Sequence, residues 1–378
     1  MKIVAIDDQQ LVLLSLEKHL SSLGYEIKTA QNGEEGLKLI DSFEPDLLIV
    51  DINMDGMSGL DIVKQLRSED KKLSIMIMSG NTDEDTIVDG FDLGIDDYMK
   101  KPVQLSEISV RVRRLIGVPD NFESKRVANN AQISKSCVGV VIPCYNEESR
   151  LLSKEFTDFL DSNLGYHLCF VNDGSKDDTL KVLKDLAKGR EDFISVYDCE
   201  KNGGKGEAVR QGMLHLVRDP QLDYLGYLDA DLSTDFKDFD DLVNTIENSD
   251  FQIVSGSRIA RMGADINKES AREIISLTIN FIIRKILGMN FKDTQCGAKI
   301  IRRDLVKVVF KDKFLTRWLF DVEIFKRMGN IYGKEKAVSM ICEQPLKRWI
   351  HADGSKLSMK DSLKIVGQLG EIAVKYRS

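Results

Sequence analysis

Charged or polar residues follow four apolar runs of the N-terminal third at the point where each run ends. Asp7 and Asp8 follow the first run, Asp51 the third, Ser79 the fourth and Lys101 the fifth. The carboxyl ends of parallel strands share one edge of a sheet, so these side chains are expected to converge. Three carboxylates that close repel one another unless a cation lies among them, and hard oxygen ligands suit Mg²⁺. A carboxylate beside Mg²⁺ and a lysine is well placed to attack a phosphoryl group.

A second set of such residues lies in the middle of the chain. Asp173 ends an apolar run, and the glycine-rich segment 202–206 places Lys205 ahead of a helical pattern, which suits a phosphate. Asp229 and Asp231 follow another apolar run, and two carboxylates at alternate positions can share a divalent cation. That cation would neutralise a diphosphate leaving group. A lone D-x-D motif is often only a turn, so the neighbouring residues are what favour the catalytic interpretation.

Short apolar runs that alternate with helical patterns predict the elements that position these residues. Such alternation implies a parallel sheet covered on both faces, and therefore an α/β fold. The expected strands of the first series are Lys2–Ile6, Glu26–Thr29, Leu47–Val50, Ser74–Met78 and Asp97–Met99. After the polar segment 117–136, those of the second series are Val138–Ile142, Leu168–Val171, Ile194–Tyr197, Tyr224–Leu228 and Gln252–Val254.

Composition and charge limit the classes of function. The sequence has 378 residues, 42% of them apolar and 30% charged, which is typical of a soluble globular protein with two or three domains. The net charge is −9 over residues 1–119 and −10 over residues 120–260. Residues 261–378 contain 24 basic and 13 acidic residues, a net charge of +11. The acidic balance argues against nucleic acid as a partner, whereas the basic third suits phosphates or an anionic membrane surface.

The sequence also indicates the cellular compartment. The six cysteines form no C-x-x-C pair, so buried reduced thiols are expected rather than disulfides or zinc. The start of the chain has no basic segment followed by an apolar one, so no signal peptide is expected. The longest nearly apolar stretch, 274–283, is about half of the ~20 residues that a spanning helix needs. A cytoplasmic protein is expected, either free or peripheral at the inner face of the membrane.

Residues 1–117 resemble a response-regulator receiver domain over their whole length. The motifs that carry the resemblance are IDD at 6–8, VDINMDGMSGLD at 50–61, MSG at 78–80 and YMKKP at 98–102. The resemblance implies a flavodoxin-like (βα)5 fold and phosphorylation of Asp51 by a histidine kinase. It also implies Mg²⁺ held by Asp8, Asp51 and the backbone carbonyl of Asn53, with Asp7 in the outer shell.

The same resemblance implies how the phosphoryl group is sensed. Ser79 would contact this group, Lys101 would be its ion partner, and Tyr98 would be the aromatic switch residue. The predicted domains are a receiver at 1–118, a linker at 119–136 and a second domain at 137–378.

The second domain resembles a family 2 glycosyltransferase with the GT-A fold, which is Rossmann-like with a mixed sheet. It is most similar to the branch that makes polyprenyl-phosphate sugars, including dolichyl-phosphate glucosyltransferases. The motifs are VGVVIPCYNEESRL at 138–151, VNDGSKDDT at 171–179, DADLSTD at 229–235, SGSR at 255–258, DTQCGAK at 293–299, RWLFDVEI at 317–324 and DGSKL at 353–357.

This second resemblance implies roles for individual residues. The nucleotide sugar would be held by Pro143, Tyr145, Glu147, Asp173, Lys205 and Asp229. Asp229 and Asp231 would bind Mg²⁺ or Mn²⁺. On the acceptor side, Arg258, Gln295 and Lys356 would contribute, and Asp321 would help to shape the pocket.

The implied reaction is a single in-line displacement at the anomeric carbon, with inversion. The donor is a UDP-sugar or a GDP-sugar, with UDP-glucose favoured, since Asp173 can accept from uracil or guanine alike. A polyprenyl-phosphate acceptor is already ionised near neutral pH, because its second pKa is about 6. A hydroxyl acceptor would need a general base, which the sequence does not identify.

Three questions remain open at this level. Phosphorylation of Asp51 is expected to control the transferase, either by forming a homodimer or by releasing an inhibitory contact. The alternative is a non-catalytic signalling module that binds a nucleotide sugar or a protein partner. The segment 270–288 is amphipathic, and it is expected either to lie in a membrane interface, to pack on the sheet or to form a dimer contact.

Overall fold

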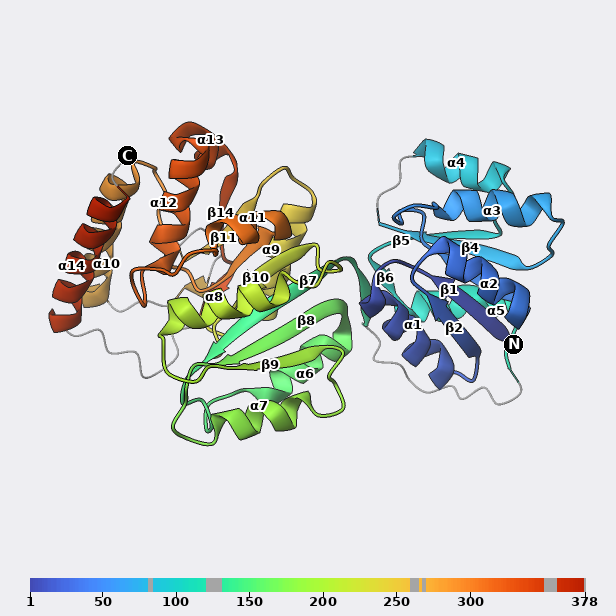
Figure 1. The fold of residues 1–378 in the computed structure, drawn as a ribbon, viewed down its shortest axis with the longest axis horizontal. Helices are drawn as coiled ribbons and strands as arrows, with labels where there is room; N and C mark the ends of the chain where they lie inside the picture. The colour runs from blue at the N-terminus through green and yellow to red at the C-terminus, as the bar shows by residue number, and fades with distance from the viewer. Residues whose placement is uncertain (81–83, 120–130, 259–264, 267–269, 350–358, 377–378) are drawn as a thin grey trace. The chain divides into compact units, whose positions relative to one another are not determined.

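The computed structural model describes residues 1–378 apart from 81–83, 120–130, 259–264, 267–269, 350–358 and 377–378. The chain forms two compact units (Figure 1). The first contains Met1–Cys137 and Lys154–Tyr166, and the second contains Val138–Ser153 and His167–Ser378.

The first unit is built on a sheet of parallel strands in the order β2-β1-β3-β4-β5. Every residue of β3 is buried, as expected where helices cover both faces of a parallel sheet. The strands are β1 (Lys2–Ile6), β2 (Glu26–Ala30), β3 (Leu47–Val50), β4 (Ser74–Ser79) and β5 (Asp97–Lys100). The flavodoxin-like fold predicted for this part of the chain is therefore confirmed.

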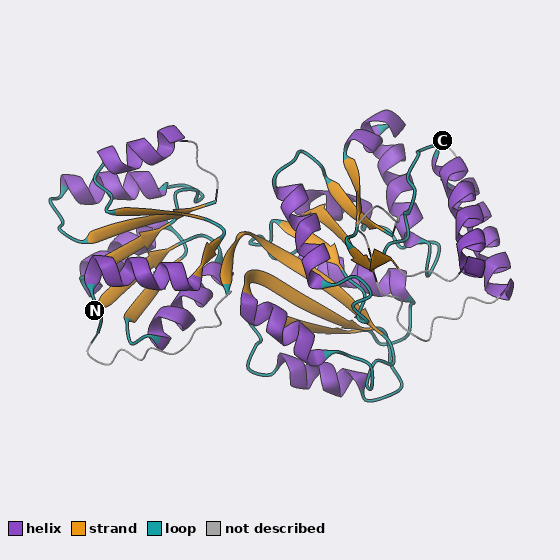
Figure 2. Cartoon of the chain, turned by 180° about the vertical axis from the view of Figure 1, so that it is seen from behind, coloured by secondary structure: helices purple, strands orange, loops and turns teal. Residues whose placement is uncertain are grey.

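Helices cover both faces of this sheet (Figure 2). On one face, His19 of α1 and Ser109 of α5 are hydrogen-bonded at 2.7 Å. On the other, Ile40 and Phe43 of α2 pack with α3 over β1, β3 and β4. A capping box between Ser58 and Asp61 fixes the start of α3 directly after the β3 loop. The helices are α1 (Gln10–Ser22), α2 (Gly33–Phe43), α3 (Gly59–Ser68), α4 (Glu84–Asp92) and α5 (Leu105–Ile116).

The later sheet is mixed, with the order β14-β11-β13-β10-β7-β8-β9. Strand β13 is antiparallel to both of its neighbours, β10 and β11, whereas β10 is parallel to β7 and β8 is parallel to β9. The strands are β7 (Gln132–Cys144), β8 (Asn163–Asn172), β9 (Ile194–Asp198), β10 (Tyr224–Tyr227), β11 (Ile253–Ser257), β13 (Lys299–Arg302) and β14 (Ile341–Pro345). The mixed sheet predicted for the second domain is therefore confirmed.

The remaining elements surround this sheet or extend it. The short strands are β6 (Val103–Gln104), β12 (Asp265–Ile266) and β15 (Arg348–Trp349), and β12 pairs with β15. The helices are α6 (Ser153–Ser162), α7 (Thr179–Ala187), α8 (Lys205–Leu216), α9 (Phe236–Glu247), α10 (Ser270–Leu287), α11 (Arg303–Val309), α12 (Phe320–Tyr332), α13 (Lys334–Ser339) and α14 (Met359–Lys375).

Strand β7 begins at Gln132, inside the segment 119–136 that was predicted as a linker. The polar composition of this segment concealed the alternation around Ile133, which is fully buried. Within the first unit, Ile133 and Gln132 pair with the short strand β6. Residues 132–136 of this segment therefore belong to a strand.

Helix α10 was expected to be amphipathic. In its described C-terminal half, Ile279, Ile283 and Leu287 are buried, whereas Phe281 is exposed. The first three residues share a face at helical spacing, so this half packs against the protein. Its main contacts are with the helices α12 and α14 rather than with the sheet, as one of the alternatives expected. None of the helices among the described residues is long and apolar enough to span a membrane.

Candidate active site and phosphorylation site

The ends of β1 and β3 bring three carboxylates together in the first unit. Ligand atoms of Asp7, Asp8 and Asp51 all lie within 4.8 Å of one another. Lys101, which follows β5, is buried and donates from Nζ to Asp7 Oδ2 at 2.7 Å and to Asp51 Oδ2 at 3.1 Å. At the end of β4, Ser79 Oγ accepts from Asn53 Nδ2 at 3.2 Å. The five residues expected to converge do so around Asp51.

The electrostatics of this cluster fit a cation. Burial raises the pKa of Asp8 to about 6, and the charges of Asp7 and Asp51 act in the same direction. Burial alone would lower the pKa of Lys101, but the two nearby carboxylates outweigh it and raise that pKa above its usual range. One ammonium therefore faces three acidic groups, and hard oxygen donors with excess negative charge are suited to Mg²⁺.

The other predicted signalling residues surround the cluster. The backbone N–H of Asn53 donates to Asp51 Oδ1 at 3.3 Å. This bond fixes the loop in which the Asn53 carbonyl was predicted as a metal ligand. Tyr98 lies on β5 and is half-buried. Gly59, at the start of α3, lies so close to the Asp51 carbonyl that a Cβ there would overlap it. The backbone of Asp51 is therefore closely packed against the start of α3.

In the second unit, two loops after β7 and β8 interlock. The backbone N–H of Asn146 donates to Ser175 Oγ at 3.1 Å. In return, the backbone N–H of Lys176 donates to the side-chain oxygen Oδ1 of Asn146 at 2.9 Å. The Glu147 amide donates to Thr179 Oγ1 at 2.8 Å. These contacts bring the predicted nucleotide-binding residue Glu147 beside the loop that contains Asp173.

Asp173 holds the glycine-rich turn ahead of α8. Its carboxylate accepts from the Gly203 amide at 2.7 Å and from the Gly204 amide at 2.9 Å. Burial raises the pKa of Asp173, although these two amides oppose the change. Gly204 has φ +88°, a backbone conformation that favours glycine. The turn directs Lys205, the first residue of α8, toward the end of β10.

Lys205 meets the D-x-D motif. Its ammonium forms an ion pair with Asp229, and both side chains are partly exposed. Asp231 is exposed, and its Oδ1 accepts from the Ser233 amide at 3.0 Å and from Ser233 Oγ at 2.8 Å. The pKa of Glu147 is raised mainly by burial, and the charge of Asp231 adds to the increase. Carboxylate oxygens of Asp229 and Asp231 suit Mg²⁺ or Mn²⁺, and a cation at Asp229 would take the place of the lysine ammonium.

The turn after α10 lies against Asp229. Gly297 lies so close to the Asp229 carboxylate that any Cβ there would overlap its oxygens. Two residues later, Lys299 on β13 is 0% exposed and donates from Nζ to the Cys296 carbonyl at 2.7 Å. Lys299 therefore fixes the backbone of the turn in which Gly297 lies against Asp229.

The same lysine is part of a buried polar cluster. Lys299 Nζ donates to Asp321 Oδ1 at 2.6 Å, and Tyr227 donates its hydroxyl proton to the same oxygen. Asp321 is 3% exposed. Burial raises the pKa of Tyr227 well above its usual range, and Asp321 adds to that effect, so the phenol keeps its proton. The structure thus places Asp321 in a buried cluster with Tyr227 and Lys299.

The predicted acceptor residues are placed differently from one another. Arg258 donates from Nε and Nη2 to Asp293 at 2.8 and 2.7 Å, and this pairing lowers the pKa of Asp293 to about 2 against the effect of burial. Gln295, two residues later, is half-buried. Lys356 lies outside the described residues. Arg258 is therefore engaged in a bidentate ion pair within the protein.

Pro143 and Tyr145 lie at the end of β7. Pro143 is half-buried and Tyr145 is exposed, directly before the interlocked loops. An exposed aromatic ring beside Glu147 and Asp173 offers a stacking surface for a base.

Comparisons with known proteins agree with both parts of this description. Residues 3–113 match the family model described as response regulator receiver domain, and residues 139–310 match that of glycosyl transferase family 2. A dolichyl-phosphate beta-glucosyltransferase of Dictyostelium discoideum is 30% identical over 292 residues, which cover 73% of this chain and 86% of that protein. One of the same name from Trichomonas vaginalis is 32% identical over 272 residues, 68% of this chain and 78% of that protein.

The chain belongs to glycosyltransferase family 2. Its N-terminal part is a response-regulator receiver domain. The response regulator MprA of Mycobacterium leprae is 37% identical over 116 residues, and the match covers 31% of this chain and 51% of that protein. This glycosyltransferase therefore combines a receiver domain and a transferase domain in one polypeptide.

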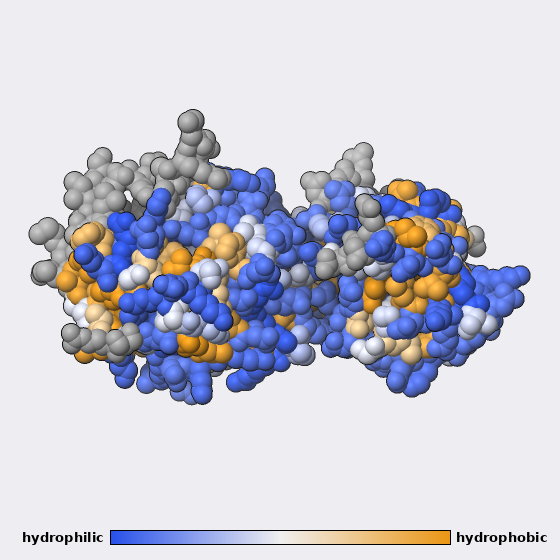
Figure 3. All heavy atoms as spheres, turned by 90° about the horizontal axis from the view of Figure 1, so that it is seen from above, coloured by the Kyte–Doolittle hydropathy of each residue, from blue (hydrophilic) through white to orange (hydrophobic). Residues whose placement is uncertain are grey.

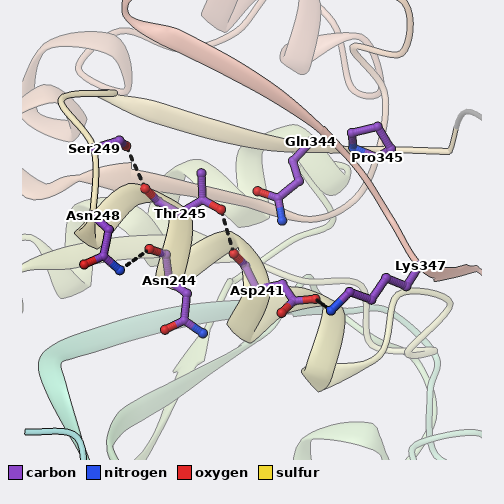
Figure 4. A pocket seen from close by; sticks show the side chains of 8 residues that line it. All are labelled: Asp241, Asn244, Thr245, Asn248, Ser249, Gln344, Pro345 and Lys347. Atoms are coloured by element: carbon purple, nitrogen blue, oxygen red, sulfur yellow. Dashed lines mark hydrogen bonds and ion pairs between the residues drawn. The ribbon is translucent and has the colours of Figure 1, made fainter.

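The transferase domain also has a polar hollow away from the D-x-D motif (Figure 4). Thr245 and Asn248 bond to carbonyls of their own helix, and Lys347 forms an ion pair with Asp241. The lining residues are Asp241, Asn244, Thr245, Asn248, Ser249, Gln344, Pro345 and Lys347. None of them was predicted as a site residue, and their polar groups largely satisfy one another.

Sequence reasoning missed several residues that shape the transferase site. Lys299 and Asp293 lie in the DTQCGAK segment, but nothing in its composition shows that Lys299 is buried. The six cysteines are present as thiols, four of them buried, as expected. Burial raises the pKa of Cys169 to about 12, so this thiol is unreactive.

Proposed function

We propose that this glycosyltransferase moves a hexose, with glucose from UDP-glucose favoured, to a polyprenyl phosphate under the control of Asp51. The observation that carries the proposal is the ion pair of Lys205 with Asp229, the first residue of the D-x-D motif, next to the Asp173 turn. The names of the two relatives support glucose as the sugar and a polyprenyl phosphate as the acceptor.

The residues of the chain have distinct tasks in this proposal. Asp229 and Asp231 would hold Mg²⁺ or Mn²⁺, which neutralises charge on the departing diphosphate when it is bound. Lys205 turns from Asp229 to the diphosphate oxygens, and the Asp173 turn receives the nucleoside. Gly297 and Lys299 keep the Asp229 carboxylate in place while its partner changes.

Transfer is a displacement at the anomeric carbon. The bond from this carbon to the diphosphate oxygen breaks as a bond forms to an acceptor phosphate oxygen on the opposite face. An α-linked donor therefore gives a β-linked product, in agreement with the "beta" in the relatives' names. A phosphate monoester is ionised near neutral pH, so as an acceptor it needs no general base. Asp321, whose carboxylate is bonded to Tyr227 and Lys299, is therefore not required in that role.

The test measures release of nucleoside diphosphate from UDP-glucose, UDP-galactose and GDP-mannose with Mn²⁺ and a short-chain polyprenyl phosphate. Lipid-dependent release is expected from UDP-glucose. Asp231→Asn should lower the rate roughly 100-fold or more, because charge on the leaving group is left uncompensated. The control is Asp250→Asn, which changes an exposed carboxylate of the same domain that takes no part in the proposed site.

Two outcomes would contradict the proposal. Full turnover in the Asp231→Asn variant would remove the metal assignment. Tight binding of a nucleotide sugar without lipid-dependent release from any donor would favour the non-catalytic module.

Control by the receiver is tested with the same assay. Beryllofluoride mimics a phosphoryl group on Asp51, and it should change the rate of the wild type but not that of Asp51→Asn. Equal rates with and without the mimic would refute control by Asp51, whatever the sugar and acceptor prove to be.

A further inference from the structure

An exposed tryptophan lies on the loop between α11 and α12. Trp318 is 64% exposed, and Leu315 on the same loop is 43% exposed. On the face seen in Figure 3, apolar residues of the second unit lie in small groups among hydrophilic ones. We call residues 310–319 the tryptophan loop. Together, the two side chains give this loop an exposed apolar surface, which a partner could cover.

The tryptophan loop is held in shape by two charged residues of α12. Glu323 is fully buried and accepts from the Leu315 amide at 2.9 Å, the Thr316 amide at 3.0 Å and Thr316 Oγ1 at 2.9 Å. Arg327 donates to the carbonyls of Val309, Asp312 and Lys313 at 2.6, 2.9 and 2.8 Å. Burying two charges is unfavourable unless they are well bonded. The loop therefore presents Trp318 and Leu315 from a fixed backbone.

The same loop touches the phosphate-binding end of α8. The Gly206 amide donates to the Arg317 carbonyl at 2.9 Å, and Arg317 donates from Nη2 to the Asn202 carbonyl at 3.0 Å. Its side chain also packs against Gly204. Trp318 directly follows Arg317. The exposed ring therefore lies on a loop that is bonded, through Arg317, to the turn that precedes Lys205.

The charges around the ring indicate the chemistry of the partner. Lys311, Lys313 and Arg317 are exposed on the tryptophan loop, and Asp312 is the acidic residue among them. The last third of the chain has a net charge of +11. Tryptophan is favoured at the boundary between lipid and water, and nearby basic residues are attracted to anionic headgroups.

We propose that the tryptophan loop docks the enzyme on an anionic lipid bilayer, with Trp318 and Leu315 in the interface and the basic residues on the headgroups. The inference deepens the proposed function, since a lipid acceptor would be reached from such a surface. Docking itself needs neither donor nor acceptor, so it can be tested separately.

Tryptophan fluorescence gives a direct test, because the chain has two tryptophans. Trp349→Phe leaves Trp318 as the reporter. Vesicles with 30% phosphatidylglycerol in phosphatidylcholine should shift its emission to the blue, and brominated lipids should quench it. Vesicles of phosphatidylcholine alone should bind much more weakly.

Variants of the full chain assign the binding to the loop in a vesicle sedimentation assay. Trp318→Ala should weaken binding roughly tenfold or more, which corresponds to the loss of one buried aromatic side chain. Lys311→Ala and Lys313→Ala should each weaken binding to the anionic vesicles about fivefold, an effect that added salt reduces. The control is Val338→Ala, which removes an exposed apolar side chain of α13.

Three results would overturn the docking proposal. The first is that no vesicle changes the emission of Trp318. The second is that Trp318→Ala sediments with anionic vesicles as well as the wild type does. The third is that nucleotide sugar alone changes the emission, which would make the ring a substrate contact. Failure of the proposed function looks different, because a chain that binds vesicles through Trp318 without transferring hexose would refute the reaction and keep the docking surface.

Discussion

Replacing Lys299 with methionine tests whether the buried cluster beneath Asp229 positions the site. Methionine keeps most of the apolar stem but removes the ammonium, which donates to Asp321 and to the Cys296 carbonyl. The ammonium also lies 5.5 Å from the centre of the Tyr227 ring. Asp321 is then left in a buried site with the Tyr227 hydroxyl as its hydrogen-bond donor.

The expected cost follows from the two states open to that carboxyl. An uncompensated buried charge costs about 3–5 kcal/mol. The alternative is to take up a proton, which at pH 7 costs a carboxyl of ordinary acidity about 4 kcal/mol. Both routes therefore predict that Lys299→Met loses about 4 kcal/mol of unfolding free energy at pH 7.

The protonation route also predicts how the loss depends on pH. A carboxyl that is protonated when folded and ionised when unfolded makes the folded state less stable as pH rises, by about 1.4 kcal/mol per unit. The difference between Lys299→Met and wild type should therefore shrink to about 1.4 kcal/mol at pH 5. Lys299→Met/Asp321→Asn should recover most of the loss, because no buried charge remains.

Urea unfolding followed by tryptophan emission measures these differences, since Trp318 and Trp349 both lie in the transferase domain. Mn²⁺ binding, measured by electron paramagnetic resonance under conditions where the variant is folded, reports the position of Asp229. An unfolding midpoint equal to that of the wild type at pH 7 would refute the reasoning. A loss independent of pH would refute the protonation route and leave the uncompensated charge. Stability lost with Mn²⁺ affinity unchanged would make the cluster structural only.

The other predictions concern the two proposed metal sites. Gly297→Ala should weaken Mn²⁺ binding roughly tenfold or more, because a methyl group would overlap the Asp229 carboxylate; Gly367→Ala, where a Cβ meets open space, is the control, and equal affinities would contradict the contact. In the receiver, the pKa of Asp8 near 6 predicts that protons compete with Mg²⁺. The Mg²⁺ concentration for half-maximal phosphorylation by acetyl phosphate should rise about fourfold from pH 7.5 to 5.5, and a flat profile on a phosphate-affinity gel would count against it.

The sequence predicted the parts of the fold that are set by local pattern. Strands β1 and β3 agree with the expected bounds, because a continuous apolar run between turn residues is typical of a strand buried on both faces. Strand β13 was not predicted, since its order between β10 and β11 depends on contacts distant in sequence. The start of β7 was concealed because its partner β6 has two residues and leaves little pattern.

The candidate sites divide in the same way. Asp7, Asp8 and Asp51 were predictable because strand ends of one parallel sheet must meet. Lys299 was not, because a lysine at the start of an apolar run is usually exposed, and its burial depends on a partner 22 residues later on α12. The engagement of Arg258 by Asp293 likewise depends on a pairing across 35 residues, which no local pattern indicates.

The ion pair between Lys205 and Asp229 makes two binding events depend on each other. Before any ligand arrives, the lysine already balances the carboxylate, so a cation that approaches Asp229 alone must compete with a tethered ammonium. In the proposed function, a diphosphate would offer Lys205 a new partner and free Asp229 for the metal. Nucleotide and metal should therefore each strengthen the binding of the other by the same factor, as thermodynamic reciprocity requires. At low concentrations of both, the resting enzyme would remain empty rather than half-loaded.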